Sequence, residues 1–334
     1  MVNIGWRIRR IGQTVFTLWV VLTLTFVLVR LLPGNPMGAM VQQLIQQGVN
    51  PARARHLVEL RLSVDPTKPI PYAYVDYMVN MLQGNLGTSM YYSEPVVDII
   101  ARSLPWTLFV LSWSLFISFF MGVIIGALMA YWEGSKLDVG LTSWAILMGS
   151  TPYYVLALLL LIFFAYRWGI FPTSGRQPTG VPPGFSVAYV TGILRHAALP
   201  VLSMLVASGV ASLGMRGNSI RVLGENYLRV ARLRGLSDVT ISTQYVARNA
   251  VLPMYTAFLI SLGEMFGGSV VLEQVFSYRG LGWYMLSATY QRDYPLMMGM
   301  FTVLTIAVVL ALLIADLTYS LVDPRAGGQK SEAY

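Results

Sequence analysis

The sequence predicts an all-α protein that crosses a membrane with about six helices. Of its 334 residues, 55% are hydrophobic and only 11% are charged, and the mean hydropathy is +0.60. Soluble domains carry about 25% charged residues, so this composition indicates a membrane protein. The chain also contains uncharged runs of about 20 residues, the length that a helix needs to span a bilayer. It has no cysteine, which excludes disulfides, thiolate metal sites and a cysteine nucleophile.

Six apolar stretches are predicted to be the membrane spans. They are residues 11–29, 103–132, 139–166, 197–215, 249–272 and 294–315. The third contains Pro152, which predicts a kink because proline removes one backbone hydrogen bond. The fourth is rich in Gly, Ala and Ser, as expected where helices pack closely. A signal peptide is the alternative for the first stretch, but no small-residue cleavage site follows it, so we predict a retained helix.

Basic residues predict which side of the membrane each connection occupies. An even number of spans places both termini on one side with residues 133–138 and 216–248, and this set holds 12 Lys and Arg in roughly 70 residues. The connections on the other side are 30–102, 167–196 and 273–293. They hold 11 Lys and Arg in roughly 125 residues, so the first set is predicted to be cytoplasmic. Three arginines on the second side favour the reverse: Arg167, Arg176 and Arg195.

The chain is therefore predicted to divide into three parts. Residues 1–32 form the cytoplasmic N-terminus and first transmembrane helix, and residues 33–102 form an extracellular loop region. Residues 103–334 form a core transmembrane domain of five helices, which contains the cytoplasmic loop 216–248. The density of arginine beside apolar spans, rather than on a soluble basic face, also argues against nucleic acid as a partner.

Within the extracellular region, residues 93–105 (SEPVVDIIARSLP) predict an amphipathic helix at the membrane surface that leads into the second span. Ser93 is the expected N-cap and Pro95 is expected in the first turn. The apolar face is expected to contain Val96, Val97 and Ile100.

The pattern of the cytoplasmic loop predicts a helix, a glycine turn and a second helix. Helical spacing gives the first helix an apolar stripe of Leu223, Tyr227, Val230 and Ala231. Glu225 precedes Arg229 by four residues, a favourable helical ion pair. Gly235 is suited to a left-handed stop, and Ser237 to capping a second helix that runs to about Asn249.

These residues alone leave two alternatives for the loop. One is an anchor at the membrane surface whose arginines contact anionic lipid headgroups. The other is a docking surface for a soluble partner. Six arginines lie between Arg216 and Arg248, which suits either role.

The loop resembles the cytoplasmic signature of ABC-importer permeases of the dipeptide/oligopeptide branch. YLRVARLRGLS (227–237) contains the branch's Ala-Arg-x-x-Gly-Leu-Ser core, and RNAVLP (248–253) matches its Arg-Asn-Ala-x-x-Pro run. The more general importer motif begins Glu-Ala-Ala, whereas positions 229–231 here are Arg-Val-Ala, so its acidic residue is absent. Six further pieces match in order along nearly the whole chain: LLPGNP (31–36), GNLGTS (84–89), FPTSGR (171–176), GGSVVLEQVFSYRGLG (267–282), RDYPL (292–296) and DLTYSLVDPR (316–325).

The resemblance implies a type I ABC-importer permease bundle in the cell membrane, with residues from about 225 to 237 as a coupling helix in a cleft of a cytoplasmic ATPase. The residues expected to couple are Glu225, Tyr227, Arg229, Ala231, Arg232, Arg234, Gly235, Leu236 and Ser237. The implied partners are a second homologous permease, two ATPase subunits and an extracellular solute-binding protein. The implied solute is a dipeptide or oligopeptide, with oligosaccharides or nickel as alternatives.

The chain shows no ATP site of its own. Its three lysines, Lys68, Lys136 and Lys330, lie outside any Gly-x-x-x-x-Gly-Lys-Ser/Thr phosphate loop. No catalytic or metal site and no bound cofactor is predicted, since the two histidines, His56 and His196, lie far apart in sequence. ATP and magnesium are expected on the partner subunits.

The acids within the spans have separate interpretations. Glu264 lies inside the fifth span, where an exposed charge costs roughly 2–4 kcal/mol, so it is expected to face the bundle interior, either lining the solute path or in a structural hydrogen bond. Asp316 and Asp323 are interpreted as packing and boundary residues.

An ion-coupled carrier, which usually has inverted repeats and several intramembrane acids, is the alternative class. A membrane-embedded enzyme lacks the required nucleophile–base pair or metal cluster, and a channel would function without an ATPase.

Overall fold

The computed structural model describes residues 4–31, 36–46, 48–61, 69–237 and 240–322. For some positions inside helices, including residues 262–269, it describes the backbone only. Every element in the described chain is a helix, which confirms the all-α prediction. The elements are α1 (Ile4–Leu31), α2 (Pro36–Gln46), α3 (Pro51–Arg61), α4 (Ile70–Leu82), α5 (Val96–Tyr131), α6 (Lys136–Ser150), α7 (Tyr153–Leu160), η1 (Leu161–Arg167), α8 (Val187–Ser203), α9 (Val206–Leu223), α10 (Asn226–Leu233), η2 (Ile241–Ala247), α12 (Arg248–Val275), α13 (Leu281–Gln291) and α14 (Tyr294–Val322).

Three helices of the described chain are long and apolar enough to cross a membrane. They are Ile8–Leu28 of α1, α5, and Tyr294–Ile314 of α14, and they match the first, second and last predicted spans. The number rises to five if each of two bent helix pairs is one span. The fifth predicted span forms α12, a 28-residue helix that includes the backbone-only residues 262–269.

The third and fourth predicted spans are bent rather than straight. The axis of α6 makes an angle of 98° with the helix formed by α7 and η1, which is far more than the predicted kink. The break lies directly before Pro152. Thr151 is extended there (φ −94°, ψ 122°), because the proline ring disfavours the helical conformation of the preceding residue. α8 meets α9 at 58°, so the fourth predicted span begins in one helix and ends in the next.

The surface helix predicted over residues 93–105 does not exist as a separate element. α5 begins at Val96 and continues through Pro105 into the membrane span. The predicted cap was wrong: Ser93 has a left-handed φ of 56°, and Pro95 is the N-cap. The apolar face also differs, because Val97 is 42% exposed.

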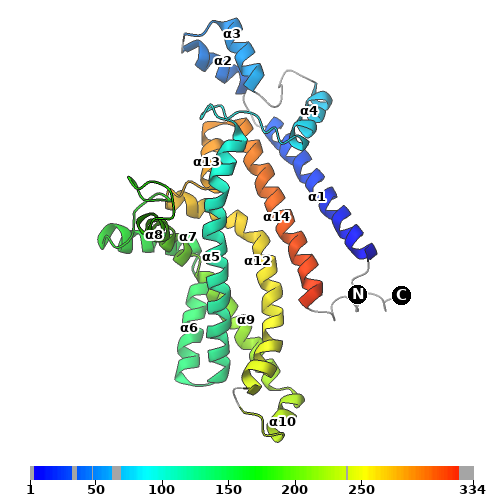
Figure 1. The fold of residues 1–334 in the computed structure, drawn as a ribbon, viewed down its shortest axis with the longest axis vertical. Helices are drawn as coiled ribbons and strands as arrows, with labels where there is room; N and C mark the ends of the chain where they lie inside the picture. The colour runs from blue at the N-terminus through cyan, green and yellow to red at the C-terminus, as the bar shows by residue number, and fades with distance from the viewer. Residues whose placement is uncertain (1–3, 32–35, 47, 62–68, 238–239, 323–334) are drawn as a thin grey trace.

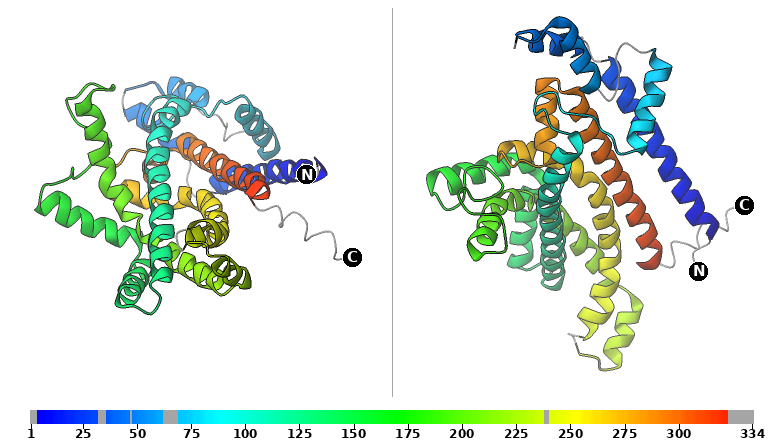
Figure 2. Two further views of the ribbon diagram at one scale, coloured as in Figure 1. Left: turned by 60° about the horizontal axis from the view of Figure 1, so that its bottom comes forward. Right: turned by 45° about the horizontal axis from the view of Figure 1, so that its top comes forward.

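The bundle has two distinct ends (Figure 1). The start of α1, the end of α14, the α5–α6 turn and α10 lie toward one end, and α2, α3 and α13 lie toward the other. The right-hand view of Figure 2 keeps this arrangement. This agrees with the sequence prediction, which placed both termini, residues 133–138 and residues 216–248 on the same, cytoplasmic side.

Two of the three arginines that favour the reverse orientation make bonds to backbone carbonyls. The Arg195 guanidinium donates to the Ile170 carbonyl at 2.6 Å. Arg176 donates to the carbonyls of Arg102 and Arg279, and its guanidinium carbon lies 5.1 Å from the centre of the Trp106 ring. These side chains hold connecting segments together, which gives them a structural role besides any effect on topology.

α5 and α9 pack side by side with almost no space between their backbones. A Cβ added at Gly126 of α5 would lie 2.6 Å from the Met215 Cβ and 3.0 Å from the Arg216 backbone nitrogen. Such distances are shorter than real carbon contacts, so only glycine allows this approach of two helices.

Replacing Gly126 with valine is therefore expected to destabilise the fold by roughly 1–3 kcal/mol, because the added carbons force α9 away from α5. The matched control is Gly140→Val on α6, where nothing lies within 4 Å of an added Cβ. Thermal unfolding of both variants in detergent measures the difference. Equal midpoints for the two variants would contradict the close contact.

Candidate functional site

The predicted coupling residues form a small helix that projects from one end of the bundle (Figure 1). α9 ends at Leu223, and Glu225 adopts an extended conformation (φ −76°, ψ 140°) before α10 begins. This extended residue interrupts the helix and changes the direction of the chain. α10 then runs for eight residues, Asn226–Leu233.

One face of α10 is fixed to the start of the next long helix. Leu228 and Ala231 are buried against Ile241 and Val246 of η2. The Asn249 amide donates to the Tyr227 hydroxyl at 3.2 Å and to the Tyr245 carbonyl at 2.8 Å. Because η2 continues directly into α12, these contacts join α10 to the start of α12.

The predicted apolar stripe was wrong in part. Leu228, which the stripe omitted, is the most buried residue of α10, whereas Val230 is 55% exposed and Tyr227 is 38% exposed. The break at Gly224 and Glu225 explains the error, since residues before and after it no longer share one helical phase. Glu225 occupies the N-cap position of α10 without a side-chain capping bond and, in the part of the chain that the structure describes, makes no ion pair with Arg229.

The glycine turn predicted at the end of α10 is confirmed. Gly235 has a φ of +73°, its N–H donates to the Arg232 carbonyl at 2.9 Å, and the Leu236 N–H donates to the Ala231 carbonyl at 3.3 Å. This pair of bonds is the Schellman arrangement that ends many helices in a left-handed glycine. Ser237 acts as the predicted cap, because its hydroxyl accepts from the Thr240 N–H at 3.3 Å.

The other face of α10 is exposed, apolar and basic. Val230 and Leu233 are 55% and 81% exposed. Three arginines on or next to the same short helix are exposed: Arg229, Arg232 and Arg234. Arginine beside exposed apolar side chains is typical of protein interfaces.

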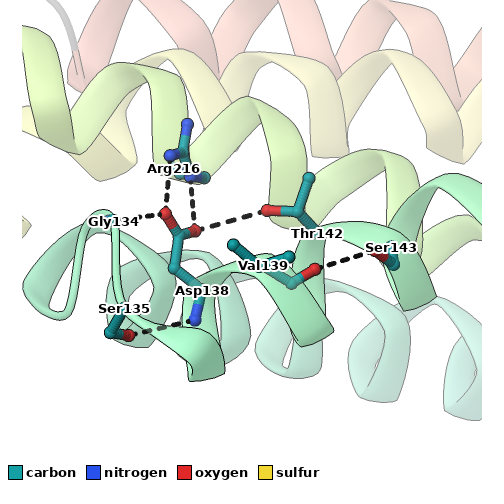
Figure 3. Close-up of polar contacts among 7 residues, drawn as sticks. All are labelled: Gly134, Ser135, Asp138, Val139, Thr142, Ser143 and Arg216. Atoms are coloured by element: carbon teal, nitrogen blue, oxygen red, sulfur yellow. Dashed lines mark hydrogen bonds and ion pairs between the residues drawn. The ribbon is translucent and has the colours of Figure 1, made fainter.

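An ion pair joins α9 to the first turn of α6 (Figure 3). Asp138, in the first turn of α6, receives two bonds of 2.8 Å from Nε and Nη2 of Arg216 on α9. Its carboxylate also accepts from the Gly134 N–H at 3.0 Å and the Thr142 hydroxyl at 3.3 Å. The Asp138 side chain is only 4% exposed, so this bidentate pair holds the two helices in one register.

The sequence interpretation did not single out Asp138. One signal was available, because Ser135 precedes Asp138 by three residues in the spacing of a helix capping box. The Ser135 hydroxyl accepts from the Asp138 N–H at 3.2 Å, as that motif requires. Arg216 was identified only as the start of the arginine-rich loop.

A second buried acid lies at the opposite end of the bundle. Glu273, near the end of α12, accepts from the Thr107 hydroxyl at 2.7 Å and from the Trp283 N–H at 2.9 Å. The Thr107 hydroxyl also accepts from the Leu281 N–H at 2.8 Å. Two of the free N–H groups at the start of α13 are thus satisfied by side chains from α12 and α5.

The remaining candidate acids and histidines have separate positions. Glu264 lies on α12, where its side chain is outside the described residues, as is that of Asp316 on α14; Asp323 is outside them altogether. His56 is on α3, and His196 is on α8, where its ring bonds to the Gly192 carbonyl at 2.7 Å. Among the described residues, no three acidic or histidine side chains gather where they would hold a metal ion.

Comparison with known proteins gives the chain its relatives. Residues 122–328 match the family described as binding-protein-dependent transport system inner membrane component. The oligopeptide transport system permease protein AppB of Bacillus subtilis (strain 168) is 32% identical over 321 residues, 95% of this chain and 98% of that protein. The di/tripeptide transport system permease protein DppB of Pseudomonas aeruginosa (strain UCBPP-PA14) is 30% identical over 336 residues, 96% of this chain and 98% of that protein.

The fold also occurs in a solved structure. A chain of the MetNI methionine ABC transporter in an inward-facing conformation superposes with a TM-score of 0.56 at 18% identity, covering 69% of this chain and 99% of the other. At that identity the likeness concerns the fold, which is that of an ABC-importer permease. The chain therefore belongs to the family of binding-protein-dependent transport system inner membrane components.

Proposed function

We propose that this chain is a permease subunit that forms half of the translocation pathway for dipeptides or oligopeptides. The family assignment makes it a transport subunit that depends on ATPase and binding-protein partners. Peptide as the solute is supported by AppB and DppB, which are named as oligopeptide and di/tripeptide permeases and align from end to end with this chain. Oligosaccharides and nickel remain the alternative solutes.

The proposed assembly contains a second homologous permease, two cytoplasmic ATPase subunits that hold ATP and magnesium, and an extracellular binding protein. Both termini of this chain are proposed to be cytoplasmic. The clustering of the α1 start, the α14 end and α10 at one end of the bundle supports this orientation.

α10 is the proposed contact with the ATPase. The observation that carries this proposal is its two-sided construction, in which Leu228 and Ala231 are buried on η2 while Val230 and Leu233 are exposed beside three arginines. α10 is in contact with the start of α12, and it follows α9, which carries Arg216 of the Asp138–Arg216 pair. It is therefore suited to transmit a movement of a soluble partner to the transmembrane helices.

Cross-linking tests this contact cleanly because the chain has no cysteine. A single cysteine at Leu233 is expected to cross-link to an ATPase subunit in membranes that contain the whole transporter. Glu133→Cys, an exposed position in the α5–α6 turn at the same end of the bundle, is the matched control and is expected to cross-link far less. Equal yields from the two positions would contradict the assignment of α10.

The solute is tested by uptake into vesicles that contain the complete transporter. ATP-dependent accumulation of a labelled dipeptide or oligopeptide, and not of nickel or an oligosaccharide, is the expected result. Solute movement by the isolated chain without nucleotide would contradict an ATP-driven permease and favour an ion-coupled carrier.

A further inference from the structure

The helix α4 exposes apolar side chains and half-buries polar ones, the reverse of a helix in a soluble protein. Its exposed side carries a stripe of Tyr72, Val75, Val79 and Leu82, which are 69%, 58%, 45% and 87% exposed. These residues are three or four apart and lie on one face of the helix. The polar residues Asp76 and Asn80 lie off this stripe and are half-buried. A helix facing water shows the opposite arrangement.

The opposite face of α4 packs against two membrane-spanning helices. Ala73 and Tyr77 are fully buried against Phe26 of α1 and Met298 of α14. The rings of Phe26 and Tyr77 lie 5.4 Å apart, and the Tyr77 hydroxyl lies 3.4 Å from the hydroxyl of Thr302 on α14.

A second hydrogen bond extends this contact along α1. The Tyr74 hydroxyl lies 2.7 Å from the hydroxyl of Thr23. α4 is thus fixed against both long helices along its inner face, and it runs beside α1 at the α13 end of the bundle (Figures 1 and 2).

These contacts set the depth of α4 relative to the bilayer. The candidate spans Ile8–Leu28 and Tyr294–Ile314 each have 21 residues, which closely matches the hydrocarbon thickness of about 30 Å. At about 1.5 Å per residue, the α1 contacts Thr23 and Phe26 lie roughly 3–8 Å inside the end of the first span. Met298 and Thr302 lie roughly 6–12 Å inside the α14 span by the same measure. α4 therefore lies beside the outer two to three turns of both candidate spans.

The composition of the stripe favours lipid over protein as its neighbour. Helix contacts inside membranes use small residues such as Gly, Ala and Ser, and none of these is in the stripe. Soluble interfaces are enriched in Tyr, Trp, Phe, Met and Arg, and of these the stripe contains only Tyr72, at its first position. Val and Leu side chains that project from a helix at this depth match acyl chains, and Tyr72 suits the boundary with the headgroups.

We propose that α4 is a membrane-embedded helix whose stripe of Tyr72, Val75, Val79 and Leu82 binds the acyl chains of the leaflet at the α13 end. Residues 70–82 then lie in the membrane rather than in the extracellular loop region predicted over 33–102. The helix lengthens the apolar surface of α1 and fixes the end of that helix to α14. This inference does not depend on the solute or on the ATPase contact.

Site-directed fluorescence tests it in the full-length chain, purified with its associated subunits and reconstituted in phosphatidylcholine vesicles. The absence of native cysteine allows Val79→Cys and, independently, Val75→Cys to carry one thiol-reactive fluorophore each. Ala52→Cys on α3, also exposed, is the matched control. Quenching is compared between phosphatidylcholine with a nitroxide on its acyl chain and iodide in the aqueous phase.

The expected result is that labels at Val75 and Val79 emit at shorter wavelength than the label at Ala52 and are quenched several-fold more strongly by the lipid-borne nitroxide. Quenching by iodide as strong as at Ala52 would overturn the proposal by placing α4 in water. Shielding from both quenchers would also overturn it, because a protein subunit would then cover the stripe. Since both substitutions are at exposed positions, two labelled variants guard against one that fails to assemble.

Discussion

Replacing Gly235 with valine is expected to abolish most solute uptake while leaving the chain at normal levels in the membrane. Gly235 has a φ of +73°, and nothing lies within 4 Å of a Cβ added there. The cost of the substitution is therefore conformational rather than steric. A left-handed conformation costs an L-residue about 1–2 kcal/mol, which reduces the population of the native turn roughly 5- to 30-fold.

The loss is expected at coupling because of where the turn lies. The two hydrogen bonds that end α10 both depend on Gly235 being left-handed, and they set the direction in which the chain returns to η2. If the turn changes, the exposed face of α10 no longer has a fixed orientation relative to α12. The ATPase activity of the assembled transporter is expected to persist while transport per ATP falls.

Two control variants separate this effect from general damage. Gly235→Asn is expected to retain much of the uptake, because asparagine tolerates the left-handed region better than other non-glycine residues. Gly217→Val on α9, where nothing lies within 4 Å of an added Cβ and no left-handed conformation is required, is expected to retain uptake as well. Wild-type uptake by Gly235→Val would count against α10 as the coupling element.

Features that depend on neighbouring residues in sequence could be predicted. The long uncharged runs became α1, α5 and α14, and the left-handed stop at Gly235 and the cap at Ser237 formed as expected, because length, composition and turn chemistry are local properties. The N-cap predicted at Ser93 is an exception, because Pro95 takes that position and Ser93 lies in a left-handed turn in which the Ser89 hydroxyl accepts from the Tyr92 N–H at 3.0 Å. The same Ser89 hydroxyl donates to Asp293, 204 positions away, so this turn does not depend on neighbouring residues alone.

Features that depend on partners far away in sequence could not be predicted. Asp138 and Arg216 are 78 positions apart, and Glu273 and Thr107 are 166 apart, so no local pattern joins them. The angle at Pro152 also depends on distant residues. Proline predicts a break in the helix, but the direction of the break depends on the packing of α7 against α8 and α12. The buried face of α10 was missed because the two-residue break at Gly224 and Glu225 changes the helical phase of every later position.

The Asp138–Arg216 pair gives the second large expected effect, and the two partners are not equivalent. The Arg216 side chain is 28% exposed, whereas that of Asp138 is 4% exposed. Arg216→Gln leaves a buried carboxylate without its counter-charge, while Asp138→Asn leaves a guanidinium that still reaches solvent. An unpaired buried charge is strongly destabilising, so Arg216→Gln is expected to lower the thermal unfolding midpoint more than Asp138→Asn.

The double variant Asp138→Asn with Arg216→Gln distinguishes direct coupling from two separate defects. Because it contains no buried charge, it is expected to unfold at a higher temperature than Arg216→Gln alone, although it has one more substitution. Lys136→Gln, at an exposed position in the same turn, is the control and is expected to leave the midpoint unchanged. Unfolding midpoints in detergent that fall additively in the double variant would show that the two side chains do not act as a pair. A rescued midpoint together with lost uptake would show that the charged, bidentate contact is required for transmitting movement from α9 to the α5–α6 turn, beyond its contribution to stability.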